Sequence, residues 1–436
     1  MVDAKKRFPL IQVALDFTEG ERALKVAGEA FKAGISWIEA GTPLIKSEGL
    51  SIVRRLKGLF PGARIVADMK VMDTGRLEAE MAFKSGADIV VVLGNASDGT
   101  IRESVEAANH YGGEVMVDLM EGAMNVLRAR AVEALGASYI GVHIPIDTQM
   151  SGRISFGPVR EISRAVSVPL VLAGGLNSEN IVEGVKSGAS ILVVGGAITK
   201  SPDIPSSVAA LQEALKSGRP VKTDLYKRVS GSGLHKILIK VSSSNITDAM
   251  HRKGWLRGVY PVLNKPFKMA GRAFTVRTYP GDWAKPVEAI DACQKGDIIV
   301  IDAGGVAPAV WGELATNSSL TRKLGGVVIY GGIRDVQEIR DAGFPAFASI
   351  ICPQAGEPKG FGEVDVPLDI GGLAVCSGDW IVGDSDGVAV IPAGRAADVA
   401  NRAMDILERE NRIRKEIKDG GTLSGITELL RWEKAG

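Results

Sequence analysis

The feature that most constrains the fold is a unit that recurs along the first half of the chain. In each unit a short apolar run, rich in β-branched residues, ends in a polar or glycine tip, and a helix-like stretch follows. Runs that are apolar enough to be buried on both faces, and that alternate with helices, predict a parallel sheet. Eight such runs occur, at residues 10–15, 35–38, 64–67, 88–93, 114–117, 139–142, 169–172 and 191–194.

The number of units favours one architecture over another. Eight strand–helix units within roughly 200–250 residues predict an α/β fold with a closed (β/α)8 barrel, the TIM barrel. An open doubly wound sheet is the alternative, but such sheets usually stop at about five or six strands. Helix signals between the runs agree with the units. Residues 18–21 fit a capping box, and Gly34, Gly86 and Gly188 are placed to end helices in a left-handed conformation.

Ionisable residues lie at the C-terminal ends of several of these apolar runs. In a barrel of this kind these ends converge on one face, where active sites lie. A single ion pair there would suit a structural role, because charged groups are rarely buried without partners. A whole set of ionisable residues at one mouth indicates a site instead. The set comprises Asp16, Glu39, Asp68 with Lys70 just beyond it, Asp118 and His143.

These residue types suit metal-assisted proton chemistry. Glu39 and Asp68, on neighbouring strands, are oxygen donors for a hard cation such as Mg²⁺ or Mn²⁺, which can stabilise an enediolate. Lys70, expected between Asp68 and Asp73, stays protonated because two carboxylates favour its charge, so it would donate a proton or face an oxyanion. His143 can move a proton near neutral pH, and a hydrogen-bonded core histidine is the structural alternative.

Paired glycines follow the last two runs, at Gly174-Gly175 and Gly195-Gly196. The loops after the seventh and eighth strands of such barrels commonly bind phosphate through backbone N–H groups. Glycine pairs also occur in ordinary tight turns, so their position, more than their composition, predicts a phosphate site.

At these residues the sequence resembles a known family. Residues 68–73, DMKVMD, fit the D-x-K-x-x-D signature of the orotidine 5′-phosphate decarboxylase superfamily. A closer resemblance, to 3-hexulose-6-phosphate synthase, extends from Leu10 to about Pro202. It is carried by IEAGTPLI at 38–45, MDTG at 72–75, and the spacing of His143, Asp147 and Gln149.

The resemblance implies an aldolase. In that family Mg²⁺ is held by the acids that match Glu39 and Asp68, and ribulose 5-phosphate is deprotonated to an enediolate that attacks formaldehyde. His143 would be the acid/base, with Lys70, Asp68 and Asp73 as further catalytic residues. Contacts to the sugar phosphate would then come from Asp16, Asp118, Gly174, Gly175, Gly195 and Gly196.

Two other members of the superfamily stay open as alternatives. The 3-keto-gulonate-6-phosphate decarboxylases carry arginines where this sequence has Ile146 and Gly196, and commonly a glutamate where it has Asp118. Orotidine 5′-phosphate decarboxylase shares the Asp/Lys/Asp set, but it needs no metal and requires pyrimidine-recognition residues that the sequence does not show.

The second half of the chain shows a different pattern of predicted strands and helices. With 436 residues the chain is too long for one ordinary core. A helix-like segment at 206–216 is followed by two glycine-containing breaks, which predicts a barrel domain at 1–216, a linker at 217–235 and a second domain at 236–436. Short glycine-rich strands are predicted at 271–278, 297–301, 326–330, 346–351, 380–382 and 388–391, before a charged helix at 395–417.

One motif in this half could bind an anion. Arg334 and Asp335 follow an apolar strand, so the arginine can hold an anionic substrate while the aspartate binds a metal. A surface salt bridge would explain the pair equally well. Upstream, the start of a helix offers N–H groups that suit a carboxylate, at Gly312, Glu313, Leu314 and Ala315.

From about Asn245 to Pro392 these stretches resemble the family of regulator of ribonuclease activity A and 4-hydroxy-4-methyl-2-oxoglutarate aldolase. The resemblance implies a swivelling-type β/β/α domain. In the enzymatic members, the aspartate matching Asp335 binds magnesium and the arginine matching Arg334 holds a keto acid, whose carboxylate lies on the stretch matching 312–315. Regulators of this fold keep both residues without aldolase activity. A keto-acid aldolase or decarboxylase, and a non-catalytic module for oligomerisation or ribonuclease binding, therefore both stay open.

The overall composition limits the binding partners and the cellular location that can be expected. A formal net charge of +1 gives no field for direct nucleic-acid binding, and no apolar run reaches the ~18–20 residues of a membrane span. Three widely spaced cysteines predict neither disulfides nor a zinc site, and hence a cytoplasmic protein. Both resembled families bury shared interfaces, so a homo-oligomer is expected.

Overall fold

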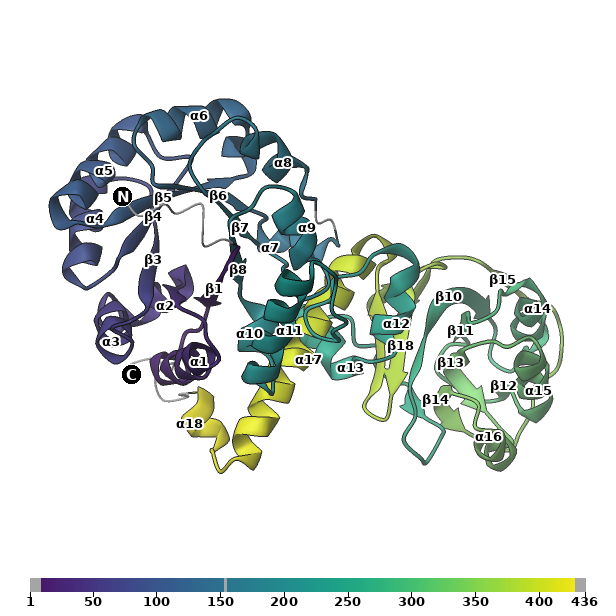
Figure 1. Ribbon diagram of the computed structural model, residues 1–436. Coiled ribbons are helices and arrows are strands. Elements are labelled where there is room, and N and C mark those ends of the chain that lie inside the picture. The colour runs from purple at the N-terminus through teal and green to yellow at the C-terminus, as the bar shows by residue number, and fades with distance from the viewer. Residues whose placement is uncertain (1–8, 153–154, 428–436) are drawn as a thin grey trace, which may run out of the picture. The chain divides into compact units, whose positions relative to one another are not determined.

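The chain folds as two compact units (Figure 1). The computed structural model describes residues 9–152 and 155–427. Of the described residues, 9–149, 155–228 and 408–427 form the first unit, and 150–152 and 229–407 form the second. No helix within the described ranges is both long enough and apolar enough to cross a membrane.

The first unit is a closed barrel of eight parallel strands in sequential order, which confirms the predicted TIM barrel. All eight predicted runs form strands, with ends that shift by a few residues. The strands are β1 (Leu10–Leu15), β2 (Trp37–Ala40), β3 (Arg64–Val71), β4 (Ile89–Leu93), β5 (Glu114–Met120), β6 (Tyr139–His143), β7 (Leu170–Ala173) and β8 (Ile191–Val194).

Helices surround this barrel. Gly34, Gly86 and Gly188 end helices with φ of 99°, 96° and 106°, as the sequence predicted. The predicted capping box at 18–21 is wrong, because the first helix begins at Gly20 without a side-chain cap. The helices are α1 (Gly20–Lys32), α2 (Thr42–Glu48), α3 (Ser51–Leu59), α4 (Gly75–Lys84), α5 (Asp98–Tyr111), α6 (Val126–Ala134), α7 (Ile146–Met150), α8 (Gly157–Ser163), α9 (Ile181–Lys186), α10 (Gly196–Thr199) and α11 (Ile204–Ser217).

The second unit is built on a mixed sheet, and its α/β class is also as predicted. A parallel centre is formed by β10 (Met269–Thr278), β11 (Ile298–Asp302), β13 (Gly326–Ile333) and β14 (Ala346–Ile351). Further strands extend this centre: β9 (Tyr260–Pro261), β12 (Ala309–Trp311), β15 (Gly362–Val364), β18 (Trp380–Asp384) and β19 (Gly387–Ile391).

Both faces of the central sheet are buried. On β11, Ile299 and Ile301 join one apolar cluster, whereas Ile298 and Val300 join another, as expected for a strand covered on both sides. The cover on the two sides comes from α14 (Ala284–Ala292), α15 (Glu313–Thr321) and α16 (Val336–Ala342), and from the hairpin of β16 (Leu368–Ile370) and β17 (Leu373–Val375). Near β18 and β19 lie α12 (Leu234–Leu238) and α13 (Ser243–Ala249).

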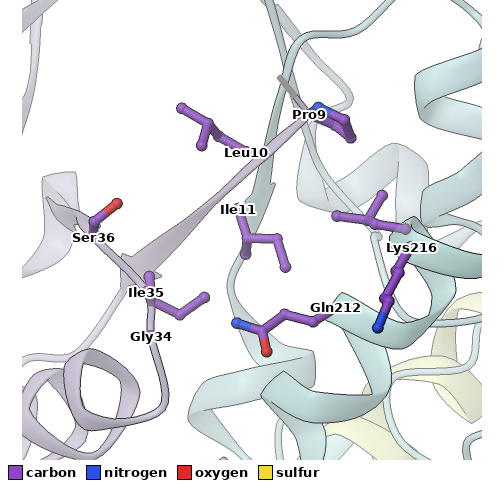
Figure 2. A pocket seen from close by; sticks show the side chains of 9 residues that line it. Pro9, Leu10, Ile11, Gly34, Ile35, Ser36, Gln212 and Lys216 are labelled. Atoms are coloured by element: carbon purple, nitrogen blue, oxygen red, sulfur yellow. The ribbon is translucent and has the colours of Figure 1, made fainter. Parts of the chain in front are cut away.

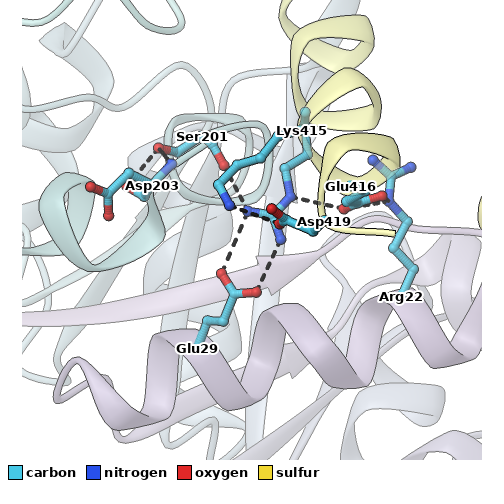
Figure 3. A network of polar contacts seen from close by, with 8 residues as sticks. Arg22, Glu29, Ser201, Asp203, Lys415, Glu416 and Asp419 are labelled. Carbon is cyan, nitrogen blue, oxygen red and sulfur yellow. Dashed lines mark hydrogen bonds and ion pairs between the residues drawn. The ribbon is translucent and has the colours of Figure 1, made fainter. Parts of the chain in front are cut away.

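The division of the chain differs from the predicted domain boundaries. The predicted linker is split, with residues up to 228 in the barrel unit, and the last part of α17 (Ala396–Lys418) also belongs with the barrel. The physical reason is a set of ion pairs in which Arg412 joins Glu29 to Glu416. Figure 3 labels both of these glutamates. Arg412 reaches Glu29 of α1 at 3.1 Å and Glu416 at 2.8 Å, so this part of the helix is held against the barrel.

Candidate active sites

The residues at the barrel mouth are placed by the two-residue period of the strands. Apolar side chains such as Ala14, Trp37, Val66 and Met116 fill the interior of the barrel. Two positions further along the same four strands, and therefore on the same inward face, come Asp16, Glu39, Asp68 and Asp118. The structure thus brings the predicted acids together, with His143 at the end of β6.

Lys70 is the centre of the polar network. Its Nζ lies 3.2 Å from Asp68 Oδ1 and 3.0 Å from Asp118 Oδ2. The same Asp118 oxygen lies 3.0 Å from His143 Nδ1. Burial alone would lower the pKa of Lys70, but the carboxylates of Asp118 and Asp68 outweigh it and raise that pKa well above its ordinary value. Lys70 is therefore a fixed cation at neutral pH.

Asp118 is a fixed anion for the complementary reason. Its burial would raise the pKa of the carboxyl, but the hydrogen bond and charge of His143 and the charge of Lys70 bring that pKa down to about 2. Because Asp118 engages Nδ1 of His143, a further contact of the imidazole would be made through the other ring nitrogen, Nε2.

The sequence predicted Lys70 to lie between Asp68 and Asp73. The structure shows the contact with Asp68, but the predicted contact with Asp73 is wrong. Asp73 lies beyond the end of β3, is exposed, and accepts a hydrogen bond from the backbone N–H of Thr74 at 2.8 Å. Asp118 takes its place because only β4 separates β5 from β3, and the curved sheet brings inward-facing side chains of β3 and β5 together. A pairing irregularity after Ala67 and a left-handed φ of 47° at Lys70 direct the lysine inward.

Three carboxylates converge beside this network. Burial raises the pKa of Glu39 well above its ordinary value, and the nearby charges of Asp68 and Asp16 raise it further. Asp16 is open to solvent on one side, yet desolvation by the walls of the mouth, together with Asp68, raises its pKa as well. Such mutual repulsion is what a divalent cation relieves.

The donor set fits Mg²⁺, an ion that takes oxygen ligands and keeps several waters. Gln12 donates its side-chain N–H to Glu39, while its own Oε1 is buried and has no hydrogen-bond partner in the described structure. A water on a bound cation could satisfy that oxygen. Among residues 9–152 and 155–427, no group of three or more His, Cys, Asp or Glu side chains forms a ready ligand cage, so the ion would rest on two carboxylates and water.

Sequence reasoning missed three residues of this site. Gln12 is the one polar side chain within β1, and its place in an apolar run was the available signal. Thr42 donates its hydroxyl to Asp68 Oδ2 at 2.8 Å and so orients that carboxylate. Gly41 is required because a Cβ there would lie 2.2 Å from Asp16 Oδ1.

The two glycine pairs follow β7 and β8, which are neighbours in the barrel. Gly174 has a φ of 106°, and a Cβ there would lie 2.4 Å from the carbonyl oxygen of Ile144. Gly175 also has a positive φ, of 72°. Glycine is therefore needed after β7 for conformation and, at Gly174, for space.

A cavity of about 330 Å³ lies at the opposite ends of the strands (Figure 2). Its lining includes Leu10 and Ile11 at the start of β1, and Gln212 and Lys216 of α11. Gln212 donates to the carbonyl of Ala33 at 3.3 Å. Because this cavity is mainly apolar and lies away from the catalytic ends, we assign it no chemical role.

In the second unit, all six predicted residues line one cavity of about 330 Å³, namely Gly312, Glu313, Leu314, Ala315, Arg334 and Asp335. Asp335 accepts a hydrogen bond from the backbone N–H of Glu313 at 3.1 Å, and Arg334 Nε lies 3.5 Å from the same carboxylate. Asp335 has a left-handed φ of 55°. Trp283 and Trp311, which the sequence analysis missed, add an apolar wall.

Two family models match the chain. The model described as Orotidine 5′-phosphate decarboxylase / HUMPS family matches residues 9–211, and the model described as Aldolase/RraA matches residues 243–390. The side chains of Ile146 and Asp147, which entered the sequence comparison, lie outside the part that the structure describes.

Each similar protein matches only a part of the chain. The 3-hexulose-6-phosphate synthase of Mycobacterium gastri is 39% identical over 205 residues, which are 47% of this chain and 99% of that protein. The 3-hexulose-6-phosphate synthase of Bacillus subtilis (strain 168) is 32% identical over 209 residues, 48% of this chain and 99% of that protein. The solved RNA-processing inhibitor RraA from Thermus thermophilis is 26% identical, with a TM-score of 0.32, and covers 34% of this chain and 92% of its own.

Proposed function

The chain belongs, through its barrel, to the Orotidine 5′-phosphate decarboxylase / HUMPS family, and from this premise we propose that the barrel is a 3-hexulose-6-phosphate synthase. Both resemblances drawn from the sequence are confirmed, the second by the Aldolase/RraA match of residues 243–390. The barrel is a lyase of the synthase type. Its proposed reaction joins ribulose 5-phosphate and formaldehyde to give D-arabino-hex-3-ulose 6-phosphate, and the reverse.

The observation that carries this proposal is the arrangement of Lys70, Asp118 and His143 beside three carboxylates. A base removes a proton from C1 of the pentulose, and the electron pair moves to the C2 oxygen to form an enediolate. C1 then attacks the carbon of formaldehyde, a carbon–carbon bond forms, and the former aldehyde oxygen takes up a proton. His143, through Nε2, is the group placed to move these protons.

Lys70 faces the negative charge that develops on the sugar oxygens. Because Asp68 and Asp118 keep Lys70 protonated, it cannot serve as the base, but it can donate hydrogen bonds to an oxyanion. Asp118 holds the imidazole in place through its contact with Nδ1. Glu39 and Asp68 would hold Mg²⁺, which when bound would add positive charge beside the same oxygens.

Metal removal tests the barrel's function against its closest rival. We expect formaldehyde-dependent consumption of ribulose 5-phosphate by the full chain, with activity lost in EDTA and restored by Mg²⁺. Orotidine 5′-phosphate should not be decarboxylated. Turnover of orotidine 5′-phosphate, or aldol activity that persists in EDTA, would contradict the proposal.

For the second unit, the cavity that gathers Arg334, Asp335 and the 312–315 stretch favours a metal-dependent keto-acid aldolase or decarboxylase. Arg334 suits the carboxylate of a keto acid, because a guanidinium binds a carboxylate with paired hydrogen bonds. Asp335 is partly exposed, so water could accompany a Mg²⁺ bound there. The competing reading, a non-catalytic regulatory module, predicts an anion-sized cavity without turnover.

Asp335→Asn separates these two readings. Asparagine tolerates the left-handed conformation, so the fold should persist while the charge is lost. We expect Mg²⁺-dependent cleavage of oxaloacetate by the wild-type chain to fall about 100-fold or more in this variant. Asp341→Asn, an exposed change on α16, is the matched control and should keep full activity. Absence of both turnover and Mg²⁺ binding in the wild-type second unit would favour the regulatory reading.

A further inference from the structure

A segment beyond the family match belongs to the barrel's mouth. The match ends at residue 211, yet the chain continues along the loop that follows β7. The backbone N–H of Val221 donates to the carbonyl of Ser178 at 2.9 Å, and the Ser178 hydroxyl donates to the Val221 carbonyl at 2.8 Å. Further along, the Asn177 side chain donates to the carbonyl of Tyr226 at 3.2 Å. Residues 221–226 are therefore anchored beside Gly174-Gly175.

The ring of Tyr226 contacts the second glycine pair, and its hydroxyl is linked to the first pair through Gln149. It is buried, and a Cβ on Gly196 would lie 2.2 Å from its edge, so the ring packs directly on that glycine. Its hydroxyl donates to Gln149 Oε1 at 3.3 Å. Gln149 in turn lies beside Gly174, where a Cβ would come within 2.8 Å of the glutamine Nε2. Tyr226 thus reaches both halves of the proposed phosphate site.

Two cationic side chains make cation–π contacts with the ring of Tyr226. Lys200 Nζ lies 5.2 Å from the ring centroid, and Arg228 Cζ lies 4.1 Å from it, both within the range of cation–π contacts. Lys200 comes four residues after Gly196. Burial and Asp68 raise the pKa of Asp16, and the positive charge of Lys200 acts in the opposite direction. The electrostatic field of Lys200 therefore reaches the barrel mouth.

The mouth needs such cations if it is to hold a phosphate ester. Asp16, Glu39, Asp68 and Asp118 are acids, and Lys70 is already engaged by two of them. A dianionic substrate would be repelled by this surplus of carboxylates unless positive charge lay near its phosphate.

We propose that Lys200 and Arg228, seated on Tyr226, form the cationic wall of the phosphate-binding site, so that a segment outside the family match completes that site. This inference rests on the proposed function, since it takes the glycine pairs as the phosphate site. The glycine N–H groups would position the phosphate, and Arg228, whose Nη1 also donates to the Lys227 carbonyl at 3.4 Å, would add positive charge beside it. The ligand class is a phosphate monoester dianion.

Phosphate binding tests the inference without relying on catalysis. The probe is inorganic phosphate, titrated calorimetrically into the full chain and into Arg228→Met and Lys200→Met. Methionine keeps the length and the apolar stem while it removes the charge. We expect each variant to bind phosphate about tenfold or more weakly, as for a lost charge-assisted contact. Lys222→Met, an exposed cation of the same segment, is the matched control and should bind as the wild type does.

Kinetics provide a second readout. In Arg228→Met the KM for ribulose 5-phosphate should rise about tenfold, while kcat and the KM for formaldehyde stay near wild type, because the cation contacts the phosphate in the ground state and the transition state alike. Arg228→Lys should restore part of the affinity. A variant that merely damaged the fold would lower kcat and would not be rescued by lysine.

The outcomes separate this inference from the proposed function. Wild-type turnover, with phosphate affinity and KM unchanged in both methionine variants, overturns the inference and leaves the aldolase standing. Phosphate binding that depends on Arg228, without aldol turnover by the wild type, overturns the aldolase and leaves the cationic wall standing. If Arg228→Met fails to fold, Lys200→Met, on the connection after β8, decides the question by itself.

Discussion

Replacing Lys70 with alanine is expected to lower formaldehyde-dependent turnover of ribulose 5-phosphate by about 10³-fold, the usual loss when a preorganised oxyanion partner is removed. The loss has two physical sources. The hydrogen-bond donor that faces the developing oxyanion disappears, and Asp68 and Asp118 lose the cation that compensates both. The measurement is kcat under saturating substrates with Mg²⁺ present.

The control for this variant is Lys84→Ala. Lys84 is an exposed lysine on α4 that contacts Glu80 and the ring of Tyr111 at the surface, so its loss should leave kcat unchanged. Circular dichroism would verify that the Lys70 variant keeps its barrel. Retention of more than a tenth of wild-type kcat in a folded Lys70→Ala protein would remove this lysine from the mechanism.

Replacing Arg412 with methionine is expected to destabilise the barrel unit by about 2 kcal/mol, the cost of losing charge-assisted hydrogen bonds to one buried and one partly exposed carboxylate. Arg412 is almost fully buried, and it donates to Glu416, Glu29 and the carbonyl of Ser201 (Figure 3). Glu416 keeps one further cation, Arg22 at 3.3 Å. Methionine fills the space but removes the donor that Glu29 and the Ser201 carbonyl share.

Arg414→Met is the matched control, because Arg414 is exposed on the same helix and pairs with Glu410 four residues away. Its expected cost is about 0.5 kcal/mol or less, as for other exposed pairs. Urea unfolding gives the difference, and hydrogen exchange of peptides from α1 assigns it to the barrel. Equal stability of the two variants would show that the Arg412 network is not the tether of this helix.

Much of the site was predictable from local pattern. Asp16, Glu39 and Asp68 each stand at the end of an apolar run, and parallel strands in a closed barrel present those ends on one face. The glycine pairs after β7 and β8 were predictable for the same reason. In the second unit, the residues at 312–315 and 334–335 follow or precede strands of one sheet, and they line one cavity as expected.

Pairings across the barrel were not predictable. Lys70 was expected to contact Asp73, three residues away, because sequence distance is the only distance that a sequence shows. The structure pairs Lys70 with Asp118 on β5, since closure of the barrel makes residues two strands apart neighbours across the interior. Tyr226 lay in a segment that composition marks as a linker, and no local signal indicates its packing on Gly196.

The strand–helix units, their number and the residues at the strand ends can be derived from the amino-acid order, because those properties depend on periods of two and 3.6 residues within short windows. The partners of Lys70, the place of residues 221–228 at the mouth and the attachment of Arg412 to the barrel depend on the folded chain. Each of these contacts joins residues that are far apart in the sequence. They come close in space because the barrel closes and because later segments of the chain pack against it.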